Sequence, residues 1–537
     1  MSASARARPP AASGPGAALS IRARSWSFRY AGRHTWAVRD LDLAVEPGER
    51  VLLAGPSGGG KSTLLTGLAG LLDAEQAADV EGTLLVGGSP PQQVRDRIGL
   101  AFQDPETQLV MARAGDDVAF GLENRAVPTE RIWPRVDEAL ALTGFPYGRD
   151  HPTGRLSGGE KQRLVLAGVV ALRPDLILLD EPTANLDPDG AALVRQAVDQ
   201  VVAATGATLV VVDHRVGDWL PLVDRVVVLR SGGGVLADGS PDKVFVADHG
   251  PLAAAGVWIP GEVPSPRRST SAPVVSAPGA SAASTGAAAP TSTPAPATST
   301  GLLIATSLGY TYPAADRPAL AGAGLRLSAG EVVAVSGANG SGKSTLAMLL
   351  AGLLTPSAGE VTVSPELSGL SSGPSGRSRK PAARSRPLHR WRAPQLVRAV
   401  GTVFQDPEHQ FLTASVRAEL ALGPRLAGLT PEAAGRRVDE LLHRLALDHL
   451  ADANPFTLSG GEKRRLSVGT ALATGPRVLV LDEPTFGQDR RTWGELVDLL
   501  AELRDDGHAI CCVSHDRDLI AALADREVRV RSGQVIG

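Results

Sequence analysis

The feature that most constrains this chain is a short glycine-rich stretch, GPSGGGKST, at residues 55–63. It follows the apolar run 51–54 and precedes residues 64–71, whose apolar side chains recur at helical spacing. The pattern predicts a buried strand, a tight loop and an amphipathic helix, in that order. An ordinary glycine-rich turn before a helix would not require Lys61 and Ser62 at their positions. We therefore interpret the stretch as a phosphate-binding loop.

The residues of this loop suit the binding of one anion. Glycines let the backbone curl, so that successive N–H groups and the helix N-terminus point toward a phosphate. Lys61 adds a positive charge for the β and γ phosphates, and Ser62 offers a hydroxyl to Mg²⁺. The expected nucleotide-binding residues are Gly55, Pro56, Ser57, Gly58, Gly59, Gly60, Lys61, Ser62 and Thr63.

The same element occurs a second time, as GANGSGKST, after the apolar run 332–335. The chain is therefore interpreted as two copies of one nucleotide-binding unit, in which Mg²⁺ accompanies the β and γ phosphates of the nucleotide. The corresponding residues of the second copy are Gly337, Ala338, Asn339, Gly340, Ser341, Gly342, Lys343, Ser344 and Thr345.

Composition limits the alternatives. A chain of 537 residues suits two or three domains, and its 54 basic and 57 acidic residues give no general attraction to nucleic acid or anionic lipid. No apolar run approaches the roughly 18 residues of a membrane-spanning helix. Cys511 and Cys512 are adjacent in an apolar stretch, which favours a buried strand in a reducing compartment over a disulfide framework; a metal or redox role for them is the minor alternative.

The expected organisation is a disordered tail at 1–18, a first domain at 19–259, a linker at 260–300 and a second domain at 301–537. Residues 269–300 carry no charge and few large apolar groups, which is typical of a disordered segment. Such a linker reaches roughly 35 Å, whereas each domain has a radius of gyration of about 18 Å. The two domains can therefore pair within one chain.

The second copy contains an insertion that the first lacks. Lys61 and Gln103 are 42 residues apart, whereas Lys343 and Gln405 are 62 apart, which places the extra residues at about 364–394. This segment either contacts lipid headgroups or nucleic acid or is a solvated surface loop. Its basic residues are Arg377, Arg379, Lys380, Arg384, Arg386, Arg390 and Arg392.

Paired carboxylates follow an apolar run in each copy, as Asp180 with Glu181 and as Asp482 with Glu483. A strand end of this kind lies at the edge where α/β proteins hold ligands. We expect the aspartate to stabilise Mg²⁺ and the glutamate to orient or deprotonate the attacking water. The alternative is that the acid caps the following helix.

The sequence LSGGE occurs at 156–160 and at 458–462, each time with its serine 23 residues before the paired carboxylates. It resembles the signature motif of ATP-binding cassette (ABC) ATPases, and the resemblance covers both copies. It implies an α/β P-loop NTPase fold: two tandem ABC-type ATPase domains, each with a RecA-like core, an antiparallel β subdomain and an α-helical signature subdomain. It also implies ATP hydrolysis.

In this family two domains close head to tail around two ATP molecules. The resemblance therefore implies that Ser459 and Gly461 complete the site of Lys61. Ser157 and Gly159 would complete the site of Lys343.

Further positions resemble the family's motifs. Gln103 and Gln405 resemble the Q-loop glutamine that senses metal and water, and His214 and His515 resemble the switch histidine near the γ-phosphate. With Glu181 and Glu483 these are the expected catalytic residues. The metal residues that the resemblance implies are Ser62, Gln103, Asp180, Ser344, Gln405 and Asp482.

Two further similarities complete the set. Asp187 and Asp489 resemble the D-loop aspartate that signals between sites. Tyr30 and Tyr312 resemble the aromatic residue that stacks on adenine, although a tyrosine near a strand is also an ordinary packing residue.

The segments QDPETQ at 103–108 and QDPEHQ at 405–410, with DVAFG at 117–121, are similar to those of energy-coupling factor transporters. The similarity implies an energy-coupling subunit of an importer for a vitamin or a transition-metal ion. Its partners would be a polytopic membrane subunit and a substrate-binding membrane component, and it would lie peripherally on the cytoplasmic face of the membrane. The sequence departs from the pattern at 419–423 and at Arg215.

Apolar residues follow both segments: Leu109, Val110 and Met111 in the first copy, and Phe411 and Leu412 in the second. They either line grooves for helices of the membrane subunit or pack against their own helical subdomain. The alternative function is a soluble twin-cassette ATPase acting on ribosomes or nucleic acid. Such proteins usually have a long, charged, helical linker, whereas residues 269–300 of this linker are uncharged and proline-rich, so no nucleic acid is expected.

Overall fold

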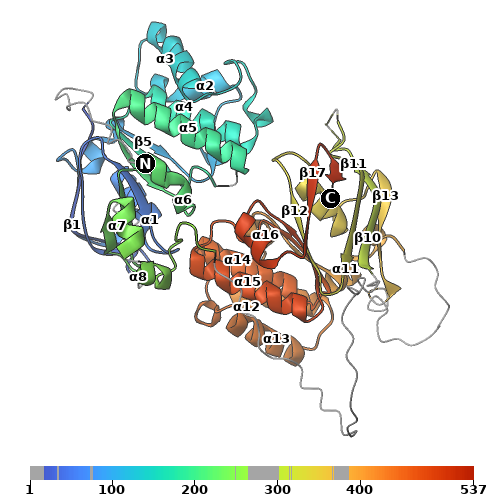
Figure 1. Ribbon diagram of the computed structural model, residues 1–537. Coiled ribbons are helices and arrows are strands. Elements are labelled where there is room, and N and C mark those ends of the chain that lie inside the picture. The colour runs from blue at the N-terminus through green and yellow to red at the C-terminus, as the bar shows by residue number, and fades with distance from the viewer. Residues whose placement is uncertain are drawn as a thin grey trace, which may run out of the picture. The chain divides into compact units, whose positions relative to one another are not determined.

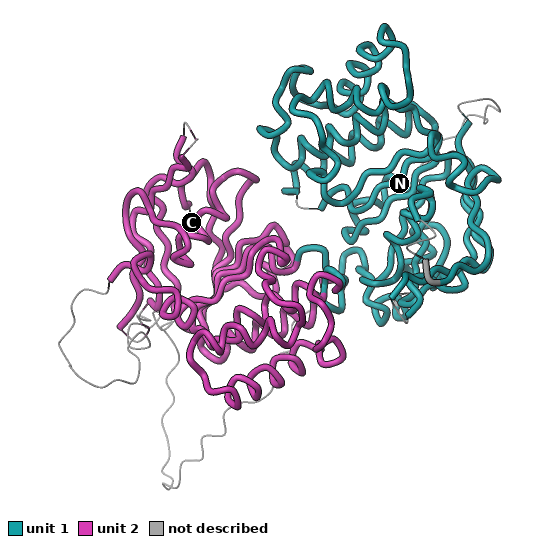
Figure 2. Tube along the Cα trace, turned by 180° about the vertical axis from the view of Figure 1, so that it is seen from behind, with its two compact units in different colours: residues 1–262, 459–461, 486–493 teal, residues 263–458, 462–485, 494–537 magenta. Residues whose placement is uncertain are grey.

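The computed structural model describes residues 17–536 except 33–34, 73–76, 185, 248, 264–300, 314, 316, 366 and 368–385. Most of the expected tail, linker and basic insertion therefore lies outside the described residues. The chain divides into two compact units, shown in different colours in Figure 2. Unit 1 comprises residues 1–262 together with 459–461 and 486–493, and unit 2 comprises the remainder.

A six-stranded sheet forms the centre of the first copy, in the order β5-β6-β7-β3-β8-β9. All neighbouring strands are parallel except the pair β8 and β9, which is antiparallel. The strands are β3 Arg50–Ala54, β5 Ile98–Ala101, β6 Leu176–Asp180, β7 Thr208–Val212, β8 Arg225–Leu229 and β9 Val235–Gly239.

The first copy also has a separate three-stranded antiparallel sheet, in the order β2-β1-β4. It consists of β1 Ile21–Tyr30, β2 Val38–Val45 and β4 Ala77–Val86. Helices α2, α3 and α4 pack around an apolar cluster of their own and form a helical layer (Figure 1). The helices of the first copy are α1 Lys61–Leu68, α2 Ala114–Asn124, α3 Thr129–Leu142, α4 Gly158–Ala171, α5 Pro188–Thr205, α6 Val216–Trp219, α7 Pro241–Ala247 and α8 His249–Ala254.

The second copy repeats this arrangement with the sheet orders β14-β15-β16-β12-β17-β18 and β11-β10-β13. Its strands are β10 Gly301–Tyr310, β11 Leu320–Ser328, β12 Val332–Ser336, β13 Ala358–Val363, β14 Val400–Val403, β15 Val478–Asp482, β16 Ala509–Val513, β17 Arg526–Arg531 and β18 Gln534–Ile536. Its helices are α9 Lys343–Leu350, α11 Ala393–Ala399, α12 Val416–Leu426, α13 Pro431–Arg444, α14 Gly460–Ala473, α15 Arg490–Asp505 and α16 Arg517–Leu523. The predicted α/β core, antiparallel subdomain and helical subdomain are thus confirmed in both copies.

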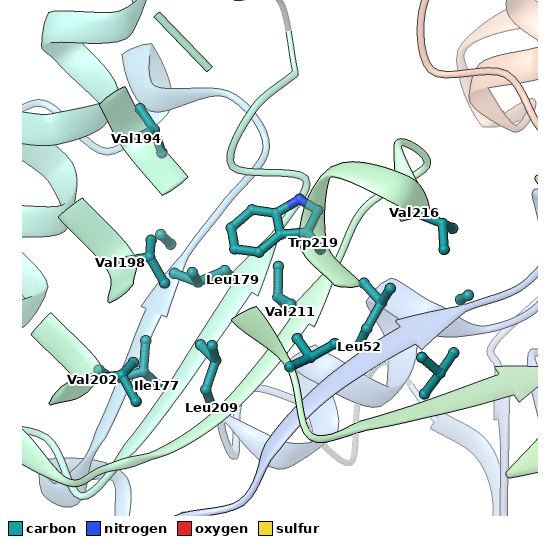
Figure 3. Close-up of a cluster of buried hydrophobic side chains, with 14 of the residues drawn as sticks. Leu52, Ile177, Leu179, Val194, Val198, Val202, Leu209, Val211, Val216 and Trp219 are labelled. Atoms are coloured by element: carbon teal, nitrogen blue, oxygen red, sulfur yellow. The ribbon is translucent and has the colours of Figure 1, made fainter. Parts of the chain in front are cut away.

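The central strands of the first copy are largely apolar because both faces of their sheet are covered. Helices α4 to α8 contribute to the apolar cluster on one face, whereas α1 and the three-stranded antiparallel sheet pack on the other. Figure 3 shows one face of the first sheet, where valines of α5 point toward Ile177 of β6 and Leu209 of β7. Trp219 of α6 lies in the same cluster and is fully buried. Its Nε1 donates a hydrogen bond to Asp213 Oδ2 at 2.9 Å, so the indole fixes a polar group directly after β7.

The predicted buried strand around the two cysteines is confirmed. Cys511 and Cys512 lie in β16 as buried free thiols, and burial raises the pKa of Cys511 to about 12. No described helix is both long and apolar enough to cross a bilayer.

Candidate functional site

Both glycine-rich loops join a central strand to a helix, β3 to α1 and β12 to α9. The loops require glycine at the residue before each helix. Gly60 has φ +85°, and a Cβ there would lie 2.4 Å from the carbonyl oxygen of Ala37. Gly342 has φ +108°, and its Cβ would lie 2.4 Å from the carbonyl oxygen of Ala319. Any side chain would therefore displace the loop from the neighbouring backbone.

The two loop lysines are held alike. Lys61 Nζ donates to the carbonyl oxygens of Gly55 and Pro56, both at 2.9 Å. Lys343 Nζ donates to the equivalent pair in its own loop, at 2.7 and 2.9 Å. Burial lowers the pKa of Lys61, while the nearby carboxylates act in the opposite direction. Each loop therefore curls around an ammonium group, as phosphate binding requires.

The paired carboxylates stand at the ends of β6 and β15, as predicted. Burial raises the pKa of Asp180 to about 6, Glu181 acts in the same direction, and a hydrogen bond with Ser62 opposes them. Burial likewise raises the pKa of Asp482, opposed by a hydrogen bond with Ser344. A carboxylate beside a serine hydroxyl is the oxygen-rich set that suits Mg²⁺.

The backbone at each glutamate is strained in the same way. Glu181 has φ +46° and Glu483 has φ +49°, a region that side chains rarely adopt. Their N–H groups donate to the carbonyl oxygens of Val212 and Val513, at 2.8 and 2.9 Å, and so fix the turn after each strand. Strain of this kind persists where the surrounding structure holds it, typically at functional sites.

The side chains of the two glutamates have different partners. Glu181 accepts a hydrogen bond from Gln103 Nε2 at 2.8 Å and lies 3.1 Å from His214 Nε2. Burial is the largest single influence and would raise the pKa of Glu181, but His214 and the charge of Lys61 together oppose it, and the net pKa is lowered. The first copy therefore brings together three residues that the sequence placed far apart.

In the second copy Glu483 accepts hydrogen bonds from Ser514 Oγ at 2.9 Å and from the His515 N–H at 3.0 Å. The imidazole Nε2 of His515 lies 3.1 Å from Asn339 Oδ1 and 4.0 Å from Glu483 Oε1. Burial is the main cause that raises the pKa of Glu483 to about 7. The two glutamates are equivalent in sequence, but their surroundings shift their pKa values in opposite directions.

An exchange of residues beside the histidines explains the departure at Arg215. In the second copy Asp516 follows the histidine and accepts from Thr485 Oγ1 at 2.8 Å. In the first copy Asp213 precedes the histidine and accepts from Thr183 Oγ1 at 2.6 Å. Sequence reasoning missed this exchange, although the letters DHR against SHD were its visible signal.

The tyrosines lie beside the glycine-rich loops. Tyr30 OH lies 3.3 Å from Thr63 Oγ1, and Tyr312 OH lies 3.1 Å from Thr345 Oγ1. Each ring also packs edge-on against an aromatic neighbour in the same copy. Their position suits a nucleotide-contacting surface, and stacking on adenine stays a prediction.

The signature and D-loop residues lie at helix N-termini. Ser157 is the N-cap of α4, and its N–H donates to Glu160 Oε2 at 2.7 Å. Asp187 is the N-cap of α5. Within unit 1, the Ser57 N–H donates to Asp489 Oδ2 at 2.9 Å. The roles of Gly159, Ser459 and Gly461 in composite sites stay predictions.

The segments after the Q-loop glutamines form short 3₁₀ turns, Pro105–Thr107 and Pro407–Gln410. Val110 is 61% exposed and Leu412 is 78% exposed, whereas Phe411 is 5% exposed. Leu109 is partly buried and packs against two clusters of its own copy. Of the two interpretations open for this region, internal packing therefore holds for Leu109 and Phe411, while Val110 and Leu412 face solvent.

Comparison with known proteins gives the family. A family model described as "ABC transporter" matches residues 38–184 and 320–486, more than half of the chain. The chain belongs to the ABC transporter family. Each copy is an ABC ATPase cassette, and the protein is an ATP hydrolase with two tandem cassettes.

Named relatives extend across both cassettes. YkoD of Bacillus subtilis, whose name assigns it provisionally as an HMP/thiamine import ATP-binding protein, is 32% identical over 93% of this chain and 87% of its own length. An ABC transporter ATP-binding protein of Bifidobacterium longum is 35% identical over 94% of this chain, which spans 64% of that relative. A solved structure, cbiO1 from Clostridium perfringens, described as part of the ABC transporter complex cbiONQ, is 31% identical over 44% of this chain and 93% of its own, with a TM-score of 0.39.

Proposed function

We propose that this protein is the energy-coupling ATPase subunit of an importer of the energy-coupling factor type, for a vitamin or a transition-metal ion. The observation that carries the proposal is the exposure of one apolar side chain, Val110 or Leu412, just after the Q-loop glutamine of each cassette. The import function in the name of YkoD supports the same direction of transport. On this proposal the protein lies peripherally on the cytoplasmic face of the membrane, with a polytopic coupling subunit and a substrate-binding membrane component as partners.

The chemistry that we assign to each cassette follows from its own residues. In the first cassette Ser62, Gln103 and Asp180 would hold Mg²⁺, which would neutralise phosphate charge when bound. Lys61 and the loop N–H groups bind the phosphates. Glu181 accepts the proton of the attacking water, and His214 and Gln103 orient its carboxylate. Ser344, Gln405, Asp482, Glu483 and His515 have the corresponding roles in the second cassette.

A carboxylate fixes the exposed segment in each cassette. Asp117 Oδ1 accepts from the N–H groups of Val110 and Met111, both at 2.8 Å. Glu419 Oε2 accepts from the N–H groups of Leu412 and Thr413, at 2.9 and 2.7 Å. The longer glutamate thus makes the bonds that aspartate makes in the first cassette, although the sequence departs there.

A lysine of the signature helix adds a second attachment. Lys161 of α4 lies 2.5 Å from Glu106, and Lys463 of α14 lies 2.5 Å from Glu408. The segment is therefore connected to both the Q-loop and the signature helix in each cassette. A helix docked on Val110 or Leu412 would be displaced when the signature helix moves during ATP-driven closure.

We predict that Val110→Asp combined with Leu412→Asp abolishes recovery of the membrane subunit. Each change places a charge where an apolar contact is proposed, which is costly on burial. The measurement is co-expression with the neighbouring membrane-protein genes, followed by affinity purification from detergent and ATP-binding measurement. Nucleotide binding should be unchanged, because neither side chain belongs to the ATP site.

The matched control is Val246→Asp on α7, which changes an equally apolar and 79% exposed side chain outside this segment. It should leave recovery of the membrane subunit unchanged. Full recovery with the double variant would contradict the docking proposal. Recovery of ribosomes or RNA in place of a membrane protein would favour the alternative function, a soluble ATPase that acts on ribosomes or nucleic acid.

A further inference from the structure

The Q-loop of the second cassette has an attachment to its signature helix through a buried arginine. Arg464 of α14 is 3% exposed. Its two terminal nitrogens donate to the carbonyl oxygens of Phe404 and Gln405, at 2.9 and 2.7 Å. Burial lowers the pKa of Arg464 to about 10, so the guanidinium remains charged at neutral pH. Two charge-assisted bonds from one planar group fix both position and orientation of the loop backbone.

A second side chain of the same helix reaches the other end of the loop. Ser467 lies one turn after Arg464 on the same helix face, and its hydroxyl bonds to Gln410 Oε1. Gln410 in turn accepts from the Phe404 N–H at 3.2 Å and donates to the Thr402 carbonyl at 2.9 Å. Helix α14 therefore holds both ends of the segment that contains Gln405.

The first cassette lacks these two donors. From the Q-loop to the D-loop the copies run in register 302 residues apart, which places Gln162 and Val165 at the positions of the arginine and the serine. Gln108 keeps its bonds to the Phe102 N–H and the Leu100 carbonyl, at 2.7 and 3.1 Å. Among the described residues of this cassette, no side chain donates to the carbonyl oxygens that correspond to those held by the arginine.

We propose that Arg464 is a positioning residue of the second ATP site, which fixes the backbone of Gln405 from the signature helix and makes this Q-loop the more rigid of the two. Movement of α14 is then transmitted directly to Gln405. The first cassette transmits the movement of α4 through fewer bonds. The two ATP sites of one chain thus respond differently to displacement of their signature helices.

This inference rests on the proposed role of Gln405 at the metal and water. Its test therefore measures the attachment by Arg464 separately from the role of Gln405. The first measurement is hydrogen–deuterium exchange of the full chain without nucleotide or Mg²⁺. Arg464→Gln, which copies the residue of the first cassette, should speed exchange of the amides at 403–411 about tenfold or more. Arg464→Lys, which has a charge but no planar fork, should give an intermediate rate.

The internal control is the equivalent segment 101–109, whose exchange should be unchanged in both variants. Unchanged exchange at 403–411 in Arg464→Gln would overturn the proposal. Faster exchange at both segments would also overturn it, because that pattern indicates general loosening of the fold.

The second measurement is the Mg²⁺ concentration that gives half-maximal ATP hydrolysis. Arg464→Gln should raise it severalfold with little change in the KM for ATP, and Arg464→Lys should restore part of the difference. A fall in kcat without a shift in the Mg²⁺ requirement would overturn the positioning role. Gln405→Ala serves as the separate test of the proposed site: if it leaves the Mg²⁺ requirement unchanged, the role of Gln405 fails while the exchange measurement still reports the attachment.

Discussion

Replacing either Glu181 or Glu483 with glutamine is expected to lower ATP turnover by about 10²-fold or more while nucleotide still binds. Glutamine preserves the size of the side chain and can still accept a hydrogen bond, but it cannot take the proton of the attacking water. Both glutamates directly follow a central strand and have the same strained backbone, so each substitution removes the proposed base of one site and leaves its frame intact. The measurement is phosphate release at saturating ATP and Mg²⁺.

The matched control is Glu138→Gln, the same chemical change at an exposed acid on α3 that pairs with Arg173 at 3.1 Å. Exposed ion pairs contribute little, so turnover should be unaffected. Full activity in either of the two active-site variants would contradict the claim that both cassettes hydrolyse ATP.

The second large effect is expected at the glycine before each loop helix. Gly60→Ala should weaken ATP binding by about 10²-fold, because the added Cβ would lie 2.4 Å from the Ala37 carbonyl oxygen and the loop must move. Gly342→Ala should act in the same way in the second cassette. Titration with a fluorescent ATP analogue measures the affinity of each variant.

Gly58→Ala is the control in the same loop. Gly58 also has positive φ, at +73°, but nothing lies within 4 Å of its Cβ position. Its substitution adds backbone strain without a collision, and we expect a loss of about tenfold or less. Equal losses for Gly58→Ala and Gly60→Ala would show that close packing around the loop is not what shapes the phosphate site.

The features that could be predicted from sequence are those that depend on patterns of neighbouring residues. Lys61 and Lys343 each stand between an apolar run and a segment with helical spacing, and this pattern predicts the glycine-rich loops. The structure has the predicted loops between β3 and α1 and between β12 and α9. The strand ends at Asp180 and Asp482 follow equally from the apolar runs before them. Each of these depends on residues close together in the chain.

What sequence reasoning missed depends on contacts between distant residues. The letters DHR and SHD show that the aspartate changes sides of the histidine, but only the threonine partners of Asp213 and Asp516 show that the two aspartates are equivalent. Leu109 and Phe411 are as apolar as their exposed neighbours. Only the packing in the structure shows which of these apolar side chains are buried and which face solvent. In the sequence Arg464 is an ordinary basic residue after a signature motif, and its role becomes apparent only from the two carbonyl oxygens to which it donates.

We expect one chain to form two working ATP sites by pairing its own cassettes. Native mass spectrometry of the chain carrying both Glu181→Gln and Glu483→Gln, in ATP and Mg²⁺, tests it most directly, because slow hydrolysis preserves the bound state. We expect a single chain carrying two ATP molecules. A species of two chains, or a single chain that saturates with one nucleotide, would contradict it.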